Sequence, residues 1–168
     1  MTTQIGQQTI QDPTSNQIAS ALLRRERMVT EMYQRVINKF HLTDPVSTLQ
    51  DLKFEHQKSV AGLSRLLERQ GIQTTTASTG LSEIRRHLSK AKALSGQHSA
   101  LSALIEGENF LRNTYRTLLS KNAIDENLRE LISHSLLPRA IENRSSLLLG
   151  NTREVSSQEA VSTTQFSA

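Results

Sequence analysis

Four long stretches of this chain carry apolar side chains at intervals of three and four residues, the spacing of one face of an α-helix. They span residues 15–40, 45–70, 98–121 and 125–149. A helix of about 24 residues is ~36 Å long, so four such helices can pack side by side around one core. The spacing therefore predicts an all-α fold in the form of a four-helix bundle.

Local signals mark where these helices begin and end. Ser15 or Asn16 is a good N-cap for the first helix. Pro45 suits the first turn of the second helix, where its missing N–H costs nothing. Gly71 follows the second helix at the position where a residue in the left-handed conformation commonly ends a helix.

The connections between the helices differ in length. Only a few residues separate the first helix from the second and the third from the fourth, which predicts two helical hairpins. A long connector, residues 72–98, joins the hairpins, and the apolar spacing over 81–94 predicts a short amphipathic helix within it. Pro138 lies inside the fourth helix, which we expect to kink or split near Leu137.

The composition indicates the extent of the folded domain and the compartment in which it works. The bundle is predicted to occupy residues 15–150, while the polar tails 1–14 and 151–168 are predicted to be disordered. The chain has no cysteine, which excludes disulfides and thiolate metal sites and favours a reducing compartment. It shows neither a signal-peptide pattern nor an apolar run of ~20 residues, so we expect a cytoplasmic protein with no membrane span.

Polar residues interrupt the apolar faces near the middle of the helices. His56 and Glu108 occupy apolar positions of the second and third helices, and either Arg25 or Glu26 fills a gap in the first. Each lies about 15 residues from its hairpin loop, so all of them should be at a similar height in a bundle whose helices rise about 1.5 Å per residue. The sequence therefore predicts a cluster of polar side chains at mid-bundle.

Two interpretations of this cluster remain open from the residues alone. Carboxylates and imidazoles inside a helical bundle can hold iron, manganese or zinc, with Glu26, His56 and Glu108 as ligands. His134 and Glu142 are candidate ligands from the fourth helix. In the alternative, the two glutamates lie at the edge of the core and extend to solvent, and His56 is a hydrogen-bonded core histidine.

The charge distribution suggests a further alternative, a weak electrostatic binder of nucleic acid. The chain carries a net charge of +4, and its basic residues gather in the first helix and the connector. The candidates are Arg24, Arg25, Arg27, Arg85, Arg86, Lys90 and Lys92. Because the interleaved aromatic residues of a single-strand binder are missing, nucleic acid is not the favoured partner.

Short motifs in this chain resemble the ferritin-like superfamily of four-helix bundles. The resemblance is to a bacterial branch of uncharacterised, stress-associated proteins, and it extends over residues 15–149. The motifs that carry it are LKFEH at 52–56, LLERQG at 66–71, EGE at 106–108 and Tyr115. The resemblance implies a ferritin-like bundle of two hairpins with a short extra helix in the connector.

The same resemblance indicates which metal ligands this chain has and which it lacks. Metal-binding members carry a lone glutamate on the first and third helices, matched here by Glu26 and Glu108. They also carry Glu-x-x-His on the second and fourth helices, but Lys58 follows Glu55 at that spacing and no such motif occurs elsewhere. The comparison favours a non-catalytic, stress-related bundle that binds a protein partner or itself over an enzyme.

Overall fold

The computed structural model of the chain describes residues 13–40, 45–74, 97–121 and 124–149. These residues form four long helices, and no strand occurs among them. The first three helices are α1 (Ser15–Phe40), α2 (Pro45–Arg69) and α4 (Gln97–Ser120). The fourth helix comprises α5 (Glu126–Leu131), the π-helical segment η1 (Ile132–Leu136) and the α-helical residues 137–149. The predicted all-α fold is confirmed.

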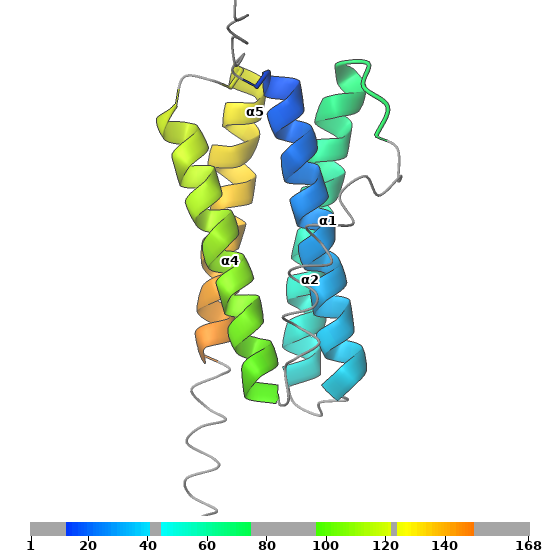
Figure 1. Cartoon of the computed structure of the whole chain (residues 1–168), viewed down its shortest axis with the longest axis vertical. Helices are drawn as coiled ribbons and strands as arrows, with labels where there is room; N and C mark the ends of the chain where they lie inside the picture. Colours follow the sequence, from blue (N-terminus) through cyan, green and yellow to red (C-terminus); the bar gives the residue numbers. More distant parts are fainter. Residues whose placement is uncertain (1–12, 41–44, 75–96, 122–123, 150–168) are drawn as a thin grey trace, which may run out of the picture.

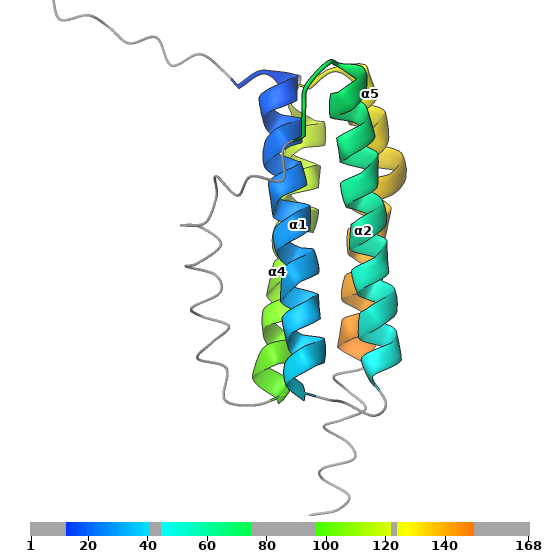
Figure 2. The same cartoon turned by 90° about the vertical axis from the view of Figure 1, so that its right-hand side faces the viewer.

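The helices pack in a ring in which each packs mainly against the helices on either side of it (Figures 1 and 2). α1 packs against α2 and α4, and the fourth helix packs against the same two. α1 and the fourth helix run in one direction along the bundle, while α2 and α4 run in the other (Figure 1). Every packed pair is therefore antiparallel, and α2 and α4 lie diagonally opposite each other.

A capping box lies at the start of α1, which begins at Ser15, one of the two predicted starts. The Thr14 N–H donates to Gln17 Oε1 at 2.8 Å, and the Gln17 N–H donates to Thr14 Oγ1 at 3.3 Å. This Thr-x-x-Gln pair satisfies two N–H groups at the helix start. The predicted N-cap, Ser15 or Asn16, is therefore wrong. Ser15 Oγ instead accepts the N–H of Asp125 at 2.8 Å and ties α1 to the start of the fourth helix.

Gly71 ends α2 as predicted. Its φ is 74°, in the left-handed region where glycine avoids the steric cost of a Cβ. The Gly71 N–H donates to Glu68 O and the Ile72 N–H donates to Leu67 O, each at 3.0 Å. These two bonds form a Schellman motif, and Ile72 packs against the core beyond it.

Pro138 is accommodated within a continuous fourth helix. The helix is not split, because residues 126–149 are helical throughout. The disturbance takes the form of the π-helical turn η1, in which the Leu137 N–H donates to Ile132 O, five residues back. The proline ring would clash with the carbonyl of residue 134 in an α-helix. A wider turn just before it relieves that conflict without ending the helix.

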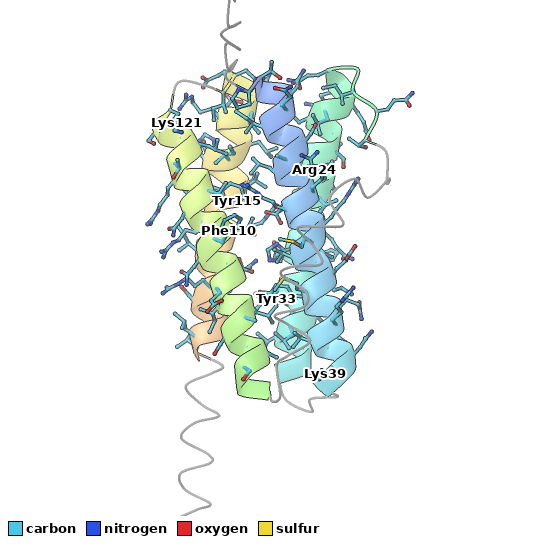
Figure 3. The ribbon with its side chains drawn as sticks, viewed as in Figure 1. Arg24, Tyr33, Lys39, Phe110, Tyr115 and Lys121 are labelled. Carbon is cyan, nitrogen blue, oxygen red and sulfur yellow. The ribbon has the colours of Figure 1, made fainter. Side chains whose placement is uncertain are left out.

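Leucine dominates the core, and two tyrosines are its largest fully buried side chains. Tyr33 on α1 and Tyr115 on α4 are both 0% exposed, and Figure 3 shows them nearer opposite ends of the bundle. In the described parts of the chain, no helix is both long and apolar enough to cross a membrane. The predicted helix at 81–94 and nearly all of both predicted tails lie outside the described residues.

Candidate functional site

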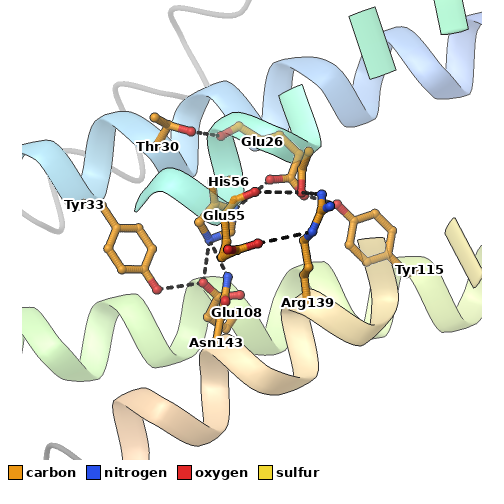
Figure 4. Close-up of polar contacts among 10 residues, drawn as sticks. Glu26, Thr30, Tyr33, Glu55, His56, Glu108, Tyr115, Arg139 and Asn143 are labelled. Carbon is orange, nitrogen blue, oxygen red and sulfur yellow. Dashed lines mark hydrogen bonds and ion pairs between the residues drawn. The ribbon is translucent and has the colours of Figure 1, made fainter. Parts of the chain in front are cut away.

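Three of the five candidate site residues meet at the centre of the bundle (Figure 4). Glu26, His56 and Glu108 come from α1, α2 and α4, and they are 2%, 2% and 0% exposed. His56 Nδ1 lies 2.7 Å from Glu26 Oε2, and His56 Nε2 lies 2.7 Å from Glu108 Oε1. One imidazole ring therefore bridges two carboxylates that belong to different helices.

The structure also decides which residue fills the gap in the first helix. Glu26 points into the core, whereas the Arg25 guanidinium lies over the Phe110 ring, 5.0 Å from its centroid. The alternative in which both glutamates extend to solvent is wrong, because Glu26 and Glu108 are buried. The second half of that alternative, a hydrogen-bonded core histidine, describes His56 correctly.

Two tyrosines extend the bridge into a chain of five hydrogen-bonded side chains. The Tyr33 hydroxyl donates to Glu108 Oε1 at 2.8 Å, and the Tyr115 hydroxyl donates to Glu26 Oε1. The order is Tyr33, Glu108, His56, Glu26, Tyr115. Each tyrosine follows a cluster glutamate on its own helix by seven residues, which is two helical turns and hence the same face. The repeated Glu-x6-Tyr spacing was the sequence signal for these hydrogen-bonded side chains.

The fourth helix contributes a residue that the sequence analysis missed. Asn143 is 2% exposed, and its Nδ2 lies 3.3 Å from His56 Nε2. Each of the four helices thus supplies at least one buried polar side chain near this level. Arg139 lies at the edge of the cluster, with Nε 3.3 Å from Glu55 Oε2 and one NH group 3.4 Å from Ser59 Oγ.

The two candidates predicted on the fourth helix do not join the cluster. Glu142 and His134 are both exposed. His134 Nδ1 lies 3.0 Å from Ser133 Oγ and 3.1 Å from Glu130 O, which are contacts within its own helix. The rotation of the fourth helix that turns Asn143 inward turns its neighbour Glu142 outward, because adjacent helical residues point about 100° apart.

The geometry around His56 fits a protonated ring. A neutral imidazole has one N–H and can donate to one carboxylate, whereas an imidazolium donates to both. Burial by itself lowers the pKa of His56, but its hydrogen bonds to Glu108 and Glu26 outweigh burial and raise the pKa from 6.5 to about 10. Burial, followed by the nearby carboxylates, raises the pKa of both Tyr33 and Tyr115 well above 10.0. Both phenols therefore remain hydrogen-bond donors at neutral pH.

This arrangement does not fit a bound iron, manganese or zinc ion. A metal ligand must offer a neutral imidazole nitrogen, but both nitrogens of His56 are directed at carboxylates at hydrogen-bond distance, which leaves neither nitrogen free to bind a metal in this arrangement. Across residues 13–40, 45–74, 97–121 and 124–149, no group of three or more Asp, Glu or His side chains is placed to hold a metal. The carboxylates instead have an internal cation, the imidazolium.

The chemistry of the cluster is that of a structural tie. The imidazolium on α2 links α1 to α4 through two charge-assisted hydrogen bonds, which are shorter and stronger than neutral ones. These side chains are at most 3% exposed, so the tie lies inside the bundle and away from its outer surface. Such a tie fixes the height and rotation of three helices relative to one another.

Comparison with known proteins does not add a relative. No protein-family model, curated protein or solved structure matches the chain. The fold and the cluster define a four-helix protein with a buried glutamate–histidine–glutamate bridge. Its function has to follow from that bridge and from the surface around it.

Proposed function

We propose that this protein is a non-catalytic, ferritin-like bundle of two helical hairpins that acts by binding a protein partner or a second copy of itself. The arrangement of the helices supports the ferritin-like assignment. α2 and α4 run in the same direction (Figure 1). A parallel second and third helix, joined by one long crossover, is a feature of ferritin-like folds.

The observation that carries the proposal is the closed centre of the bundle. Both ring nitrogens of His56 bind carboxylates, and the tyrosine hydroxyls bind the same two carboxylates. Catalytic sites in bundles leave an open position or a cleft for the substrate. With the interior engaged in holding the helices together, the outer surface is the part of the molecule available for recognition.

The outer face of the fourth helix is the best-supported contact surface. Ile141 is 40% exposed and Leu149 is 68% exposed. They are eight residues apart and so lie on one face, with the exposed Ser145 between them. We call these three residues the fourth-helix stripe.

The other large exposed apolar residues differ from the stripe because each has a cation over its ring. Phe54 lies 5.2 Å from Lys58 Nζ, and Phe110 lies 5.0 Å from the Arg25 guanidinium carbon. Cation–π contacts of this kind satisfy an exposed ring within its own chain. Phe54 is therefore a suitable control for substitutions in the fourth-helix stripe.

Sedimentation across a wide range of protein concentration tests self-association. We expect the wild type to associate, the Ile141→Ser/Leu149→Ser double variant to associate less, and Phe54→Ser to behave like the wild type. If the wild type is monomeric throughout, a photo-crosslinking residue at position 141 should capture a protein that the same residue at position 54 does not. A monomer without such selective capture would contradict the proposal.

Elemental analysis of protein purified without an affinity tag tests the non-catalytic part of the proposal. Iron, manganese or zinc near one or two ions per chain, lost in His56→Ala, would overturn it in favour of a metalloprotein. Protein that carries no metal and takes up none on addition would leave the bridge as a structural tie.

The proposal also includes a cytoplasmic location and a stress-related role. The absence of cysteine favours the cytoplasm. The stress-related role rests on the resemblance of the motifs at 52–56, 66–71 and 106–108.

A further inference from the structure

The central cluster repeats itself across the two halves of the bundle. Glu26 and Tyr33 on α1 have the same spacing as Glu108 and Tyr115 on α4. Each tyrosine donates to the glutamate of the other helix, and in both cases the acceptor is Oε1. Exchanging α1 with α4 therefore exchanges one set of contacts for the other.

The remaining two helices follow the same pattern. α2 presents Glu55 followed by His56, and the fourth helix presents Glu142 followed by Asn143. His56 and Asn143 are both 2% exposed, and they contact each other at 3.3 Å. Asn143 thus stands where the internal repeat would place a second histidine.

The repeat identifies the carboxylate oxygens that a second bridge would use. His56 joins Glu26 Oε2 to Glu108 Oε1. The equivalent bridge from position 143 would join Glu108 Oε2 to Glu26 Oε1. Glu108 Oε2 is buried and has no hydrogen-bond partner, unlike the other three oxygens of the two carboxylates. The shorter, uncharged Asn143 does not supply the missing contact.

The charge of the cluster indicates what kind of ligand this oxygen would bind. Two carboxylates and one imidazolium leave a net charge of −1 among side chains that are at most 3% exposed. A buried charge is costly unless it is compensated. A monovalent cation would neutralise the cluster, whereas a divalent cation would reverse its sign. Carboxylate oxygens are hard donors suited to such cations.

We propose that Glu108 Oε2 marks a second cation position in the cluster beside Asn143, which takes a small monovalent cation. The His56 imidazolium occupies the first position and the external cation the second. The shared chemistry is a single positive charge between carboxylate oxygens, supplied either by ammonium, which donates N–H groups as the imidazole does, or by sodium or potassium.

Thermal unfolding in four chloride salts at equal ionic strength tests this position. Ammonium, sodium and potassium are compared with tetramethylammonium, which has the same charge but is larger and has no N–H. We expect at least one small cation to raise the unfolding midpoint in a saturable way. Binding at one hundred times the dissociation constant would lower the unfolding equilibrium constant about a hundredfold. A response to ammonium alone identifies an N–H donor site, and a response to sodium or potassium identifies an oxygen-ligand site.

Variants at position 143 separate this site from general salt effects. Asn143→His places an imidazole at the second position, so the small-cation response should disappear. The exchange His56→Asn/Asn143→His should retain the response, because it only reverses the two halves. An ammonium resonance with a nuclear Overhauser effect to the Asn143 side chain provides a readout that needs no variant. Equal midpoints in all four salts, or a response unchanged in Asn143→His, would overturn the proposal.

Discussion

The middle of the bundle and the leucine layers on either side of it hold the same helices together by different means. In the leucine layers, residues such as Leu63 and Leu111 are fully buried and contribute through non-directional burial of apolar surface. In the middle, His56, Glu26 and Glu108 contribute through directed hydrogen bonds between charges. We infer that the apolar layers contribute most of the stability and that the polar layer favours one arrangement of the helices.

The largest expected loss of stability comes from removing the cation of the polar layer while keeping its two carboxylates. His56→Leu leaves Glu26 and Glu108 buried without their cation, and removing one partner of a buried ion pair costs about 3–5 kcal/mol. Urea unfolding at neutral pH measures the loss. A loss under about 1 kcal/mol would mean that the bridge adds little beyond packing, since that is the scale of an ordinary neutral hydrogen bond.

Truncation of a side chain in a leucine layer should lower the free energy of unfolding somewhat less, on average, than His56→Leu does. Leu63 is 0% exposed, so Leu63→Ala removes apolar contacts and leaves a cavity, at a cost of about 2–5 kcal/mol. The exposed Ala61 provides a matched control on the same helix, and Ala61→Ser should change the free energy of unfolding by less than about 0.5 kcal/mol.

Raising the pH should distinguish the two layers. Because the pKa of His56 is raised from 6.5 to about 10, its stabilising contribution is complete below pH 6.5 and is lost as the pH rises through 10. Each unit of pKa difference corresponds to about 1.4 kcal/mol, so the loss amounts to a few kcal/mol. Urea unfolding between pH 6 and pH 10 should show the gap between wild type and His56→Leu closing. The gap between wild type and Leu63→Ala should stay constant.

A smaller effect is expected at the ends of the hydrogen-bonded chain. Tyr33→Phe removes the hydroxyl that donates to Glu108 but keeps the ring that fills the core, which should cost about 1–3 kcal/mol. Tyr115→Phe is the matched variant on the other side and should cost more, because Glu26 Oε1 then has no donor whereas Glu108 Oε1 keeps its contact with His56. A larger loss of stability in Tyr33→Phe than in Tyr115→Phe would contradict this arrangement of the hydrogen bonds.

The smallest effect concerns the glycine beside Glu108. A Cβ at Gly107 would meet only Met32 Cε at 4.0 Å, an ordinary contact, so this helical glycine is not required for close packing. Gly107→Ala should therefore stabilise the protein by up to about 1 kcal/mol. Gly71→Ala should destabilise it, because Gly71 has a positive φ. Thermal unfolding of the two variants should shift in opposite directions.

The candidate site shows which of its residues the spacing of apolar and polar residues could predict. The interruptions of the apolar faces predicted that His56 and Glu108 lie in the core. For the first helix they left two candidates for the inward-facing residue, Arg25 and Glu26. That choice depends on a rotation of about 100° between adjacent residues, and only packing against the other helices fixes such a rotation. Asn143 was missed although its position gave a signal, since it lies three residues after Ala140 and four before Leu147 on the buried face of the fourth helix.

The sequence by itself determined the four helices, the end of α2 at Gly71 and the height at which polar residues enter the core. These features depend on periodicity and on local backbone preferences, which act over a few residues. Only the tertiary structure decided that Glu26 rather than Arg25 faces inward, and that His56 bridges two carboxylates flanked by tyrosines. Contacts between side chains 30 to 89 residues apart depend on how the helices rotate and slide against one another. Those relations are set by packing of the whole core and have no signature in any one segment.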